Sequence, residues 1–326
     1  MEPRVSVLMP VRDSERYLRS ACESILHQTL RDLELVVLDN GSVDGSVAIV
    51  EALAADDDRV RLISQEWRPL IESRNQLLQT ARAPIVAWMD SDDISRPRRL
   101  EIQLAMLEES PDLVCVGGAA RVIDPEGDPI DFENHPEHHE EIVRRQRQAG
   151  GGMRFPATMM RKDAALAVGG FRTPFLMCED LDLLVRLSEV GRLANTPEIV
   201  LDYREHLTNT SRVLGHRWPV YRDLVLKLAA ERAEKGSDAL SRGEEAVLEF
   251  PNAPLPTDLA WRTHDEWARR ALHAGHPKTA RKHMRLALAA RPWRVSSWKL
   301  WTRVLIGEKS SDFEPRFAAR PPEGLR

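Results

Sequence analysis

The chain has 326 residues, of which 42% are hydrophobic and 30% charged, so it can bury a substantial core and is long for one ordinary domain. This composition excludes gross disorder, and a formal charge of −5 excludes nucleic acid as the general partner. The three cysteines lie far apart, and no apolar run reaches the ~18 residues that span a bilayer, so we expect reduced thiols in a cytoplasmic protein.

The first third of the chain alternates short apolar runs with amphipathic ones. Strands are expected over residues 5–9, 33–38, 60–63, 85–89 and 113–116. Helices, in which apolar residues return every three or four positions, are expected over residues 15–27, 47–54, 72–80 and 98–108. This alternation predicts an α/β fold with a Rossmann-like, mostly parallel sheet between flanking helices, and ligands then bind at the carboxyl ends of the strands.

The pattern changes after Gly117. We expect a hairpin that turns at residues 124–127, a polar helix, a glycine run at 150–152, a helix over residues 180–189 and a strand over residues 199–203. Beyond residue 215 the chain is predicted to be helical over residues 218–234, 257–274, 278–290 and 293–306. The sequence therefore predicts an α/β domain over residues 1–214, a helical C-terminal region over 215–310 and a flexible tail over 311–326.

An acidic, glycine-punctuated turn follows the second expected strand, with the sequence Leu38-Asp39-Asn40-Gly41-Ser42. A carboxylate at the carboxyl end of a strand can accept hydrogen bonds from a base or a ribose. A tight turn in which Asp and Asn serve backbone geometry alone is an equally good explanation. This motif gains meaning only together with the others.

Three acids follow the fourth expected strand, in the order Asp90-Ser91-Asp92-Asp93. In an extended chain Asp90 and Asp92 project to the same side. Two close carboxylates form an oxygen-rich site for a hard divalent cation such as Mn²⁺ or Mg²⁺, which can bridge a diphosphate. A solvated acidic turn is the alternative, but three acids directly after an apolar strand favour the metal site.

A further carboxylate pair, Glu179 and Asp180, opens a helical pattern. Unpaired backbone amides at a helix N-terminus stabilise a carboxylate as an anion, so Asp180 can stay available as a base. The alternative is an acidic cap that only complements the helix dipole.

Together these motifs resemble the family 2 glycosyltransferases, which share the GT-A fold. The resemblance covers about residues 4–212 and rests on residues 5–13, 38–46, 74–75, 90–93, 169–172 and 179–180, in the family's order. It implies that residues 1–214 form the nucleotide-sugar-binding and catalytic domain of an inverting transferase. Such an enzyme moves a sugar from a nucleotide diphosphate donor to an acceptor hydroxyl, in polysaccharide, lipopolysaccharide or glycoconjugate synthesis.

For the nucleotide, the resemblance implies that Pro10 and Val11 line the base and that Asp39 binds it. Arg74 would lie beside the base or the phosphates. Asn40 departs from the family, whose commonest sequence carries a second Asp there, and this residue could tune recognition of the base or the ribose. A uridine diphosphate sugar is the expected donor.

For the ribose and the metal, the resemblance implies that Asp90 holds the ribose, with Ser91 in the same donor-binding stretch, and that Asp92 binds the divalent metal. Asp93 could share the metal. His206 follows the last expected strand and is assigned to the metal or the diphosphate, although a lone histidine is more often structural.

For the acceptor, the resemblance makes Asp180 the catalytic base, and Glu179, Phe155 and Thr158 are acceptor-side candidates. The acceptor would be a glycan, a lipid-linked molecule or a protein. A group of histidines at positions 135, 138 and 139 could imitate a metal site, but the glutamates around it favour a solvated helix.

The predicted C-terminal helices are strongly basic: Asp265 and Glu266 are the only acids between Trp261 and Ile306. Five tryptophans also lie there, at positions 261, 267, 293, 298 and 301. Basic residues interleaved with Trp suit a surface that contacts anionic lipid, which would place the protein peripherally at the inner face of the membrane. A packed helical subdomain with Trp inside and Arg in water explains the pattern at least as well.

Two other functions remain as alternatives. A nucleotidyltransferase or nucleotide-sugar pyrophosphorylase also uses a βα sheet and acidic metal ligands, but the chain lacks a basic, glycine-rich phosphate loop near its N-terminus. A non-catalytic nucleotide-sugar-binding scaffold would be expected to have lost the catalytic carboxylates, yet Asp90, Asp92 and Asp180 are all present.

Overall fold

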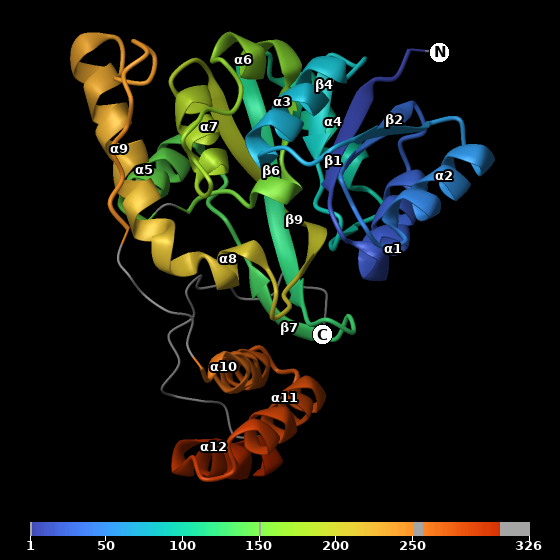
Figure 1. The fold of residues 1–326 in the computed structure, drawn as a ribbon, viewed down its shortest axis with the longest axis vertical. Coiled ribbons are helices and arrows are strands. Elements are labelled where there is room, and N and C mark those ends of the chain that lie inside the picture. The colour runs from blue at the N-terminus through green and yellow to red at the C-terminus, as the bar shows by residue number, and fades with distance from the viewer. Residues whose placement is uncertain (1, 150, 251–256, 307–326) are drawn as a thin grey trace. The chain divides into compact units, whose positions relative to one another are not determined.

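The computed structural model describes residues 2–149, 151–250 and 257–306 (Figure 1). Its sheet has nine strands in the order β3-β2-β1-β4-β8-β6-β9-β5, with β7 paired to β6. The strands are β1 (Val5–Val11), β2 (Leu33–Asn40), β3 (Val60–Gln65), β4 (Ile85–Trp88), β5 (Ile94–Ser95), β6 (Leu113–Ile123), β7 (Pro129–Glu133), β8 (Met159–Arg161) and β9 (Arg192–Arg204).

The first four strands are parallel. β1 lies between β2 and β4, and β3 pairs with the outer side of β2. The residues of β1, β2 and β4 are mostly apolar and almost all buried, as expected for strands covered on both faces, whereas β3 at the end of the strand order is mostly half-buried. The helices that connect or follow them are α1 (Glu15–Leu26), α2 (Ser46–Asp56), α3 (Leu70–Thr80) and α4 (Arg99–Glu109). The predicted α/β class with flanking helices is confirmed.

The rest of the sheet is mixed rather than parallel. β8 runs antiparallel to both β4 and β6, and β7 runs antiparallel to β6. The expectation of a mostly parallel sheet therefore holds only for β1 to β4. β8 has three residues, too few to give a periodic signal in the sequence.

Strand β6 extends well beyond its expected end at residue 116, through Gly117 and Gly118. These glycines allow β9 to approach closely: a Cβ at Gly117 would lie 2.2 Å from Asn195 Oδ1, and one at Gly118 would lie 2.7 Å from Val200 Cγ2. The two residues therefore serve packing within the sheet and do not end the strand. The hairpin expected after it is confirmed, because β6 and β7 pair on either side of residues 124–128.

The remaining helical segments are mostly those expected. They are α5 (His139–Ala149), the 3₁₀ turn η1 (Phe155–Ala157), α6 (Lys162–Ala167), α7 (Glu179–Ser188), α8 (Thr210–Val213), the 3₁₀ turn η2 (Gly215–Arg217), α9 (Trp218–Lys235), α10 (Leu259–His273), α11 (Pro277–Ala290) and α12 (Val295–Ile306). None of those in residues 2–149, 151–250 and 257–306 is long and apolar enough to cross a bilayer.

Contacts group the chain into two units. The first contact unit comprises Met1–Ala119, His135–Leu201 and Arg217–Phe250, and the second comprises Ala120–Asn134, Asp202–His216 and Pro251–Arg326. The second unit thus combines the β6–β7 hairpin, the end of β9 and helices α10 to α12. Contact units need not be folding domains, so the division at residues 214 and 310 stays a prediction. The expected flexible tail, 311–326, lies outside the described residues.

Candidate functional site

The parallel strands β1, β2 and β4 end at one edge of the sheet, and the predicted donor residues lie there. Val11 pairs in register with Asp39, and Pro10 with Leu38. Val11 and Asp39 are 2% and 4% exposed, and Pro10 is half-buried. The structure therefore brings the three predicted base-binding residues together.

Asp39 holds a buried carboxylate that is only partly satisfied. Its Oδ2 accepts a hydrogen bond from the Ser42 amide at 3.3 Å. Its Oδ1 is buried and has no hydrogen-bond partner among the described residues. Buried polar atoms in folded proteins are nearly always hydrogen-bonded, so this oxygen is suited to accept an N–H or O–H from a ligand.

Asn40 uses its whole amide to hold the loop between β3 and α3. Its Oδ1 accepts hydrogen bonds from Gln65 Nε2 at 3.0 Å and from the Arg68 amide at 2.9 Å, and its Nδ2 donates to the Arg68 carbonyl at 2.7 Å. An Asp could not make the last bond, because an ionised carboxylate only accepts. This gives the departure from the family's common sequence a structural reason.

The loops that follow β1, β2 and β4 are joined by side-chain hydrogen bonds. Asp13, with φ at 49°, accepts the Val43 amide at 2.9 Å and donates its own amide to Ser42 Oγ at 2.9 Å. Ser14 Oγ and Ser91 Oγ share a hydrogen bond of 2.8 Å. Ser91, predicted to bind the donor, thus ties the acidic turn to the loop after β1.

Asp90, Asp92 and Asp93 follow β4 and form a cluster in which one carboxylate oxygen from each lies within 4.8 Å of the others. Hard carboxylate oxygens at this spacing fit a divalent cation such as Mg²⁺ or Mn²⁺. Asp93 is fully buried, whereas Asp90 and Asp92 are half-buried. The three acids predicted to hold the ribose and the metal are therefore close together.

Burial raises the pKa of Asp90 to about 6. The positive charge of Arg74 opposes this rise, and the negative charges of Asp92 and Asp180 add to it. Like charges so close disfavour one another's ionisation, and a bound cation would relieve that repulsion. The acidic cluster therefore has unbalanced negative charge that a cationic ligand would neutralise.

One residue at this site was not predicted from the sequence. Arg99, in the first turn of α4, is fully buried and donates to the Trp88 carbonyl at 2.7 Å and the Thr158 carbonyl at 3.2 Å. Burial lowers its pKa to about 10, while Asp93 and Asp90 oppose that shift. Its place in an amphipathic helix gave no signal that its charge would face the acids.

Arg74 joins the acidic cluster to the start of α7. Its Nη1 lies 2.6 Å from Glu179 Oε1, and its guanidinium lies 4.9 Å from the Phe155 ring centre and 5.4 Å from that of Phe171. Burial raises the pKa of Glu179, although the charge of Arg74 opposes this. Arg74 is therefore held by Glu179 and two aromatic rings, and its predicted contact with the nucleotide stays a prediction.

Asp180 is the second residue of α7 and remains half-buried. Its Oδ1 accepts the Leu181 amide at 2.7 Å. Its charge acts on Asp90 and Glu179, so these three carboxylates and Arg74 form one electrostatic group. Sequence reasoning placed Asp180 at a helix N-terminus, and the structure agrees.

The other acceptor-side candidates are buried. Phe155 is 4% exposed and its ring centre lies 5.5 Å from that of Trp88. Thr158 is fully buried and its Oγ1 donates to the Phe155 carbonyl at 2.7 Å. Phe155 packs against the Arg74 guanidinium, and Thr158 holds the backbone of Phe155. The contact of both residues with an acceptor stays a prediction.

The histidines predicted as candidate metal ligands are His206 and the group at positions 135, 138 and 139. His206 lies in the second contact unit, where its Nδ1 is 2.9 Å from Thr208 Oγ1, and its metal or phosphate role stays a prediction. Of the group near residue 135, His135 is buried rather than solvated, and His139 Nδ1 accepts the Leu193 amide at 3.1 Å. Within the described part of the chain, only the aspartate cluster has the geometry of a metal site.

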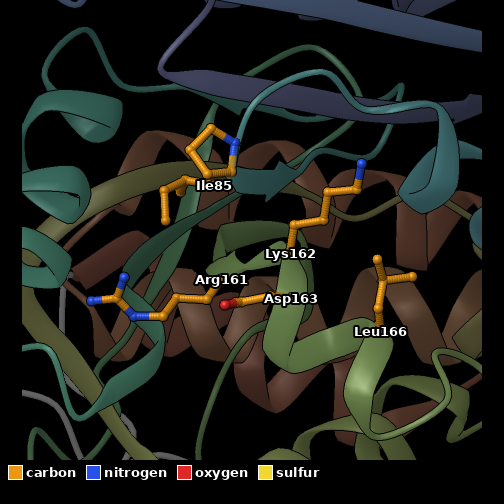
Figure 2. Close-up of a pocket in the computed structure, with 6 residues that line it drawn as sticks. Ile85, Arg161, Lys162, Asp163 and Leu166 are labelled. Carbon is orange, nitrogen blue, oxygen red and sulfur yellow. The ribbon is translucent and has the colours of Figure 1, made fainter.

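A cavity of about 240 Å³ lies elsewhere, at the amino end of β4 (Figure 2). Pro84, Ile85 and residues 161–163 and 166 line it. Its cations are already engaged, since Lys162 Nζ donates to the Ala81 carbonyl at 2.6 Å and Arg161 Nε to the Leu113 carbonyl at 2.8 Å. None of the predicted site residues lines this cavity.

Known proteins with similar sequences include glycosyltransferases. The family model described as glycosyl transferase family 2 matches residues 6–168, half of the chain. The O-antigen biosynthesis glycosyltransferase WbnJ of Escherichia coli is 31% identical over 212 residues, which are 64% of this chain and 82% of that protein. Chondroitin synthase of E. coli is 30% identical over 210 residues, 64% of this chain but only 30% of that protein.

Coverage of the relatives varies. The putative glycosyltransferase EpsE of Bacillus subtilis is 39% identical over 127 residues, 38% of this chain and 46% of that protein. The chain thus spans less than half of EpsE and of chondroitin synthase but most of WbnJ. The family model ends at residue 168, before the start of α7, so it does not include Asp180.

Solved structures share the fold. The mannosyltransferase PcManGT of Pyrobaculum calidifontis, in complex with GDP-Man and Mn²⁺, has a TM-score of 0.52 at 19% identity and covers 94% of this chain and 86% of its own. Staphylococcal TarS 1-349 (S. aureus) in complex with UDP-GlcNAc also has a TM-score of 0.52, at 15% identity, and covers 95% of this chain and 94% of its own. The GT-A fold expected from the sequence is confirmed, and with the family match it shows that the chain belongs to glycosyltransferase family 2.

Proposed function

We propose that this chain is an inverting glycosyltransferase that transfers a sugar from a nucleoside diphosphate sugar to an acceptor hydroxyl, in the synthesis of a polysaccharide, lipopolysaccharide or other glycoconjugate. The observation that carries the proposal is the electrostatic group of Asp90, Asp92, Asp180, Glu179 and Arg74 beside the carboxyl ends of the parallel strands. A cluster of carboxylates with a raised pKa in a site of this kind is typical of catalysis.

For donor binding, Pro10 and Val11 would line the base, and the open Oδ1 of Asp39 would accept a hydrogen bond from it. Asp90 would hold the ribose, with Ser91 fixing the turn. Asp92 would hold a divalent cation, with Asp93 as a further ligand. Arg74 would lie near the phosphates. When bound, that cation neutralises negative charge on the diphosphate leaving group.

For the transfer step, Asp180 would act as general base. Its carboxylate takes the proton of the acceptor hydroxyl while that oxygen forms a bond to the anomeric carbon. The bond from that carbon to the diphosphate oxygen breaks at the same time, and the nucleoside diphosphate leaves with the electron pair. Attack opposite the leaving group inverts the configuration. Glu179, Phe155 and Thr158 would shape the acceptor side, with Glu179 held by Arg74.

For the substrates, a uridine diphosphate sugar is the proposed donor, and a glycan, lipid-linked molecule or protein is the proposed acceptor. TarS, a structural neighbour, is described in complex with UDP-GlcNAc, and WbnJ is a relative named for O-antigen synthesis. We also propose a cytoplasmic location. Cys22, Cys115 and Cys178 are buried and form no disulfide among the described residues, which is common in a reducing compartment. The basic C-terminal helices would bring the enzyme to the inner face of the membrane.

The test is calorimetric titration of the full chain with uridine, guanosine, cytidine and thymidine diphosphate sugars, with and without Mn²⁺. We expect metal-dependent binding of one donor, abolished by Asp92→Asn and preserved by Asp180→Asn, because only the first variant alters the metal site. Product formation with that donor should be lost in both variants.

Two outcomes would contradict the proposal. Absence of binding by every donor would favour a scaffold that acts through other surfaces. Donor binding with release of inorganic pyrophosphate from a nucleoside triphosphate and a sugar phosphate would favour a nucleotidyltransferase.

A further inference from the structure

Helix α12 has apolar side chains on two opposite sides. Leu300 and Val304 point inward and belong to the core that α10, α11 and α12 share in the second contact unit (Figure 1, orange to red). A second set points outward, with large exposed fractions: Val295 (67%), Trp298 (50%) and Leu305 (51%). Trp293, which precedes the helix, is 71% exposed. Val295, Trp298 and Leu305 are spaced three and seven residues apart, so they share one helix face.

The structure divides the five tryptophans of this region into two groups. Trp267 is fully buried, Trp261 Nε1 donates to Ser297 Oγ at 3.0 Å, and Trp301 packs against the shared core. Trp298 instead lies at the surface, where its Nε1 donates to the Pro292 carbonyl at 2.7 Å. Packing therefore explains three of the five tryptophans and leaves Trp293 and Trp298 exposed.

The segment that carries these exposed residues has side-chain charges of one sign. Residues 277–306 contain eight Lys and Arg residues and no Asp or Glu. Lys282 is bound by Asp124 and Asp128 of the β6–β7 hairpin. Lys299 is exposed. The Arg294 side chain is 43% exposed, and its Nη2 lies 3.8 Å from Asp258 Oδ2. We define the Trp patch as Trp293, Val295, Trp298 and Leu305, with the flanking cations Arg294 and Lys299.

We propose that the Trp patch docks on an anionic lipid surface, with Trp293 and Trp298 in the headgroup region and Arg294 and Lys299 against acidic headgroups. Tryptophan is favoured at a membrane interface because its ring is apolar while its N–H is polar, and Lys and Arg near the surface are attracted to anionic lipid. The proposal rests on the peripheral position proposed above and extends it by naming the surface and the lipid charge. Asp258 lies against Arg294 but is shared with Arg262 and Arg291, so the face keeps an excess of positive charge. Such a face fits a sheet of negative charge better than a second copy of the same face.

The test uses the full chain and sedimentation with vesicles of phosphatidylcholine alone or mixed with anionic phosphatidylglycerol. We expect binding to the anionic vesicles only, a blue shift of tryptophan fluorescence on binding, and weaker binding as salt rises, because salt screens surface charge.

Two double variants separate the apolar and charged parts. Trp293→Ala/Trp298→Ala should weaken binding by at least about tenfold and remove most of the blue shift. Arg294→Gln/Lys299→Gln should weaken it by roughly 30-fold, at ~5-fold per charge, and flatten the salt dependence. The matched controls are Trp67→Ala, which removes a Trp 58% exposed in the first contact unit, and Arg19→Gln/Lys227→Gln, which removes two exposed cations there. Both controls should bind as the parent does.

Three results would overturn the proposal. They are equal binding to neutral vesicles, unchanged binding in both patch variants, or no vesicle binding together with a change of oligomeric mass in the patch variants, which would make the patch a contact between copies. Donor titration without vesicles stays an independent readout. A failure of docking with intact donor binding leaves the proposed transferase standing, and the reverse result leaves the docking surface standing.

Discussion

Asp90, at the carboxyl edge of the sheet, and Glu205, in the second contact unit, are held in opposite ways. In the second unit Glu205 is bound by Arg270 Nη1 at 2.8 Å, Arg212 Nη2 at 2.9 Å and Trp267 Nε1 at 2.6 Å. Burial alone would raise the pKa of Glu205, but the two arginines lower it to about 2. The carboxylate of Glu205 is thus fully engaged by groups of its own chain.

At the sheet edge the balance is reversed. Asp90 has Asp92 and Asp180 as neighbours, and Arg74, its main cation, is also paired with Glu179. The pKa of Asp90 is therefore raised while that of Glu205 is lowered. A network closed on itself contributes to stability, whereas a cluster short of positive charge is suited to bind a cation or exchange a proton. The following predictions test this difference, from the largest expected effect to the smallest.

Asp180→Asn should lower kcat by a factor of about 10²–10⁴, because an amide cannot take a proton from the acceptor. Donor affinity and melting temperature should stay close to those of the parent. Single-turnover kinetics with saturating donor measure the chemical step directly. A similar loss in Asp223→Asn, an exposed acid of α9, would argue against a specific role for Asp180.

Arg270→Met should destabilise the fold by about 3–5 kcal/mol, because it leaves Glu205 and Asp131 as buried carboxylates with fewer partners. Denaturant unfolding measures the change. Arg144→Gln, which breaks the exposed ion pair with Glu141, is the control and should leave the midpoint unchanged. Equal effects would mean that the second unit's network is no more important than a surface pair.

Asn40→Asp should destabilise the chain by roughly 1–3 kcal/mol, because the Arg68 carbonyl loses its donor and a second carboxylate joins Asp39. Donor affinity should fall only if the substitution displaces the loop between β3 and α3. Asn40→Ser, which keeps a donor, is the comparison. Tighter donor binding in Asn40→Asp would show that this position recognises the nucleotide directly.

Acidification should weaken the second contact unit through His264. Burial is the main cause that lowers the pKa of His264 from 6.5 to about 4, and the charges of His283 and Arg212 add to this lowering. Glu126 and Asp124 oppose this shift. The unfolded chain binds more protons between these two values, so stability falls as pH drops from about 6.5 towards 4. With a discount for partial exposure, the loss at pH 5 is about 1–2 kcal/mol.

The measurement is urea unfolding at several pH values, followed by tryptophan fluorescence. His264→Gln should flatten the slope between pH 6.5 and 4, since Gln does not titrate. A slope that persists in this variant would assign the acid sensitivity to other groups of the unit.

Much of the fold followed from local pattern. The parallel strands β1 to β4, the helices between them and the hairpin after β6 follow from apolar periodicity and turn residues, which act over a few neighbouring positions. β8 and the full length of β6 and β9 did not, because pairing between distant segments, and not local propensity, decides them. From the sequence alone, Gly117 and Gly118 suggest the end of a strand. In the structure they leave room for the side chains of Asn195 and Val200 on β9.

The candidate site also combines features that the local sequence predicts with features that only packing between distant segments decides. The sequence by itself determined the residue types and their order: a carboxylate after β2, an acidic turn after β4 and a carboxylate pair at the start of α7. Parallel strands end at one edge, so the grouping of the first two was predictable. Tertiary structure alone decided that Arg74 joins Glu179 and that Arg99 lies buried behind the acids. It also decided which tryptophans of α10 to α12 are exposed, because burial depends on what packs from elsewhere in the chain.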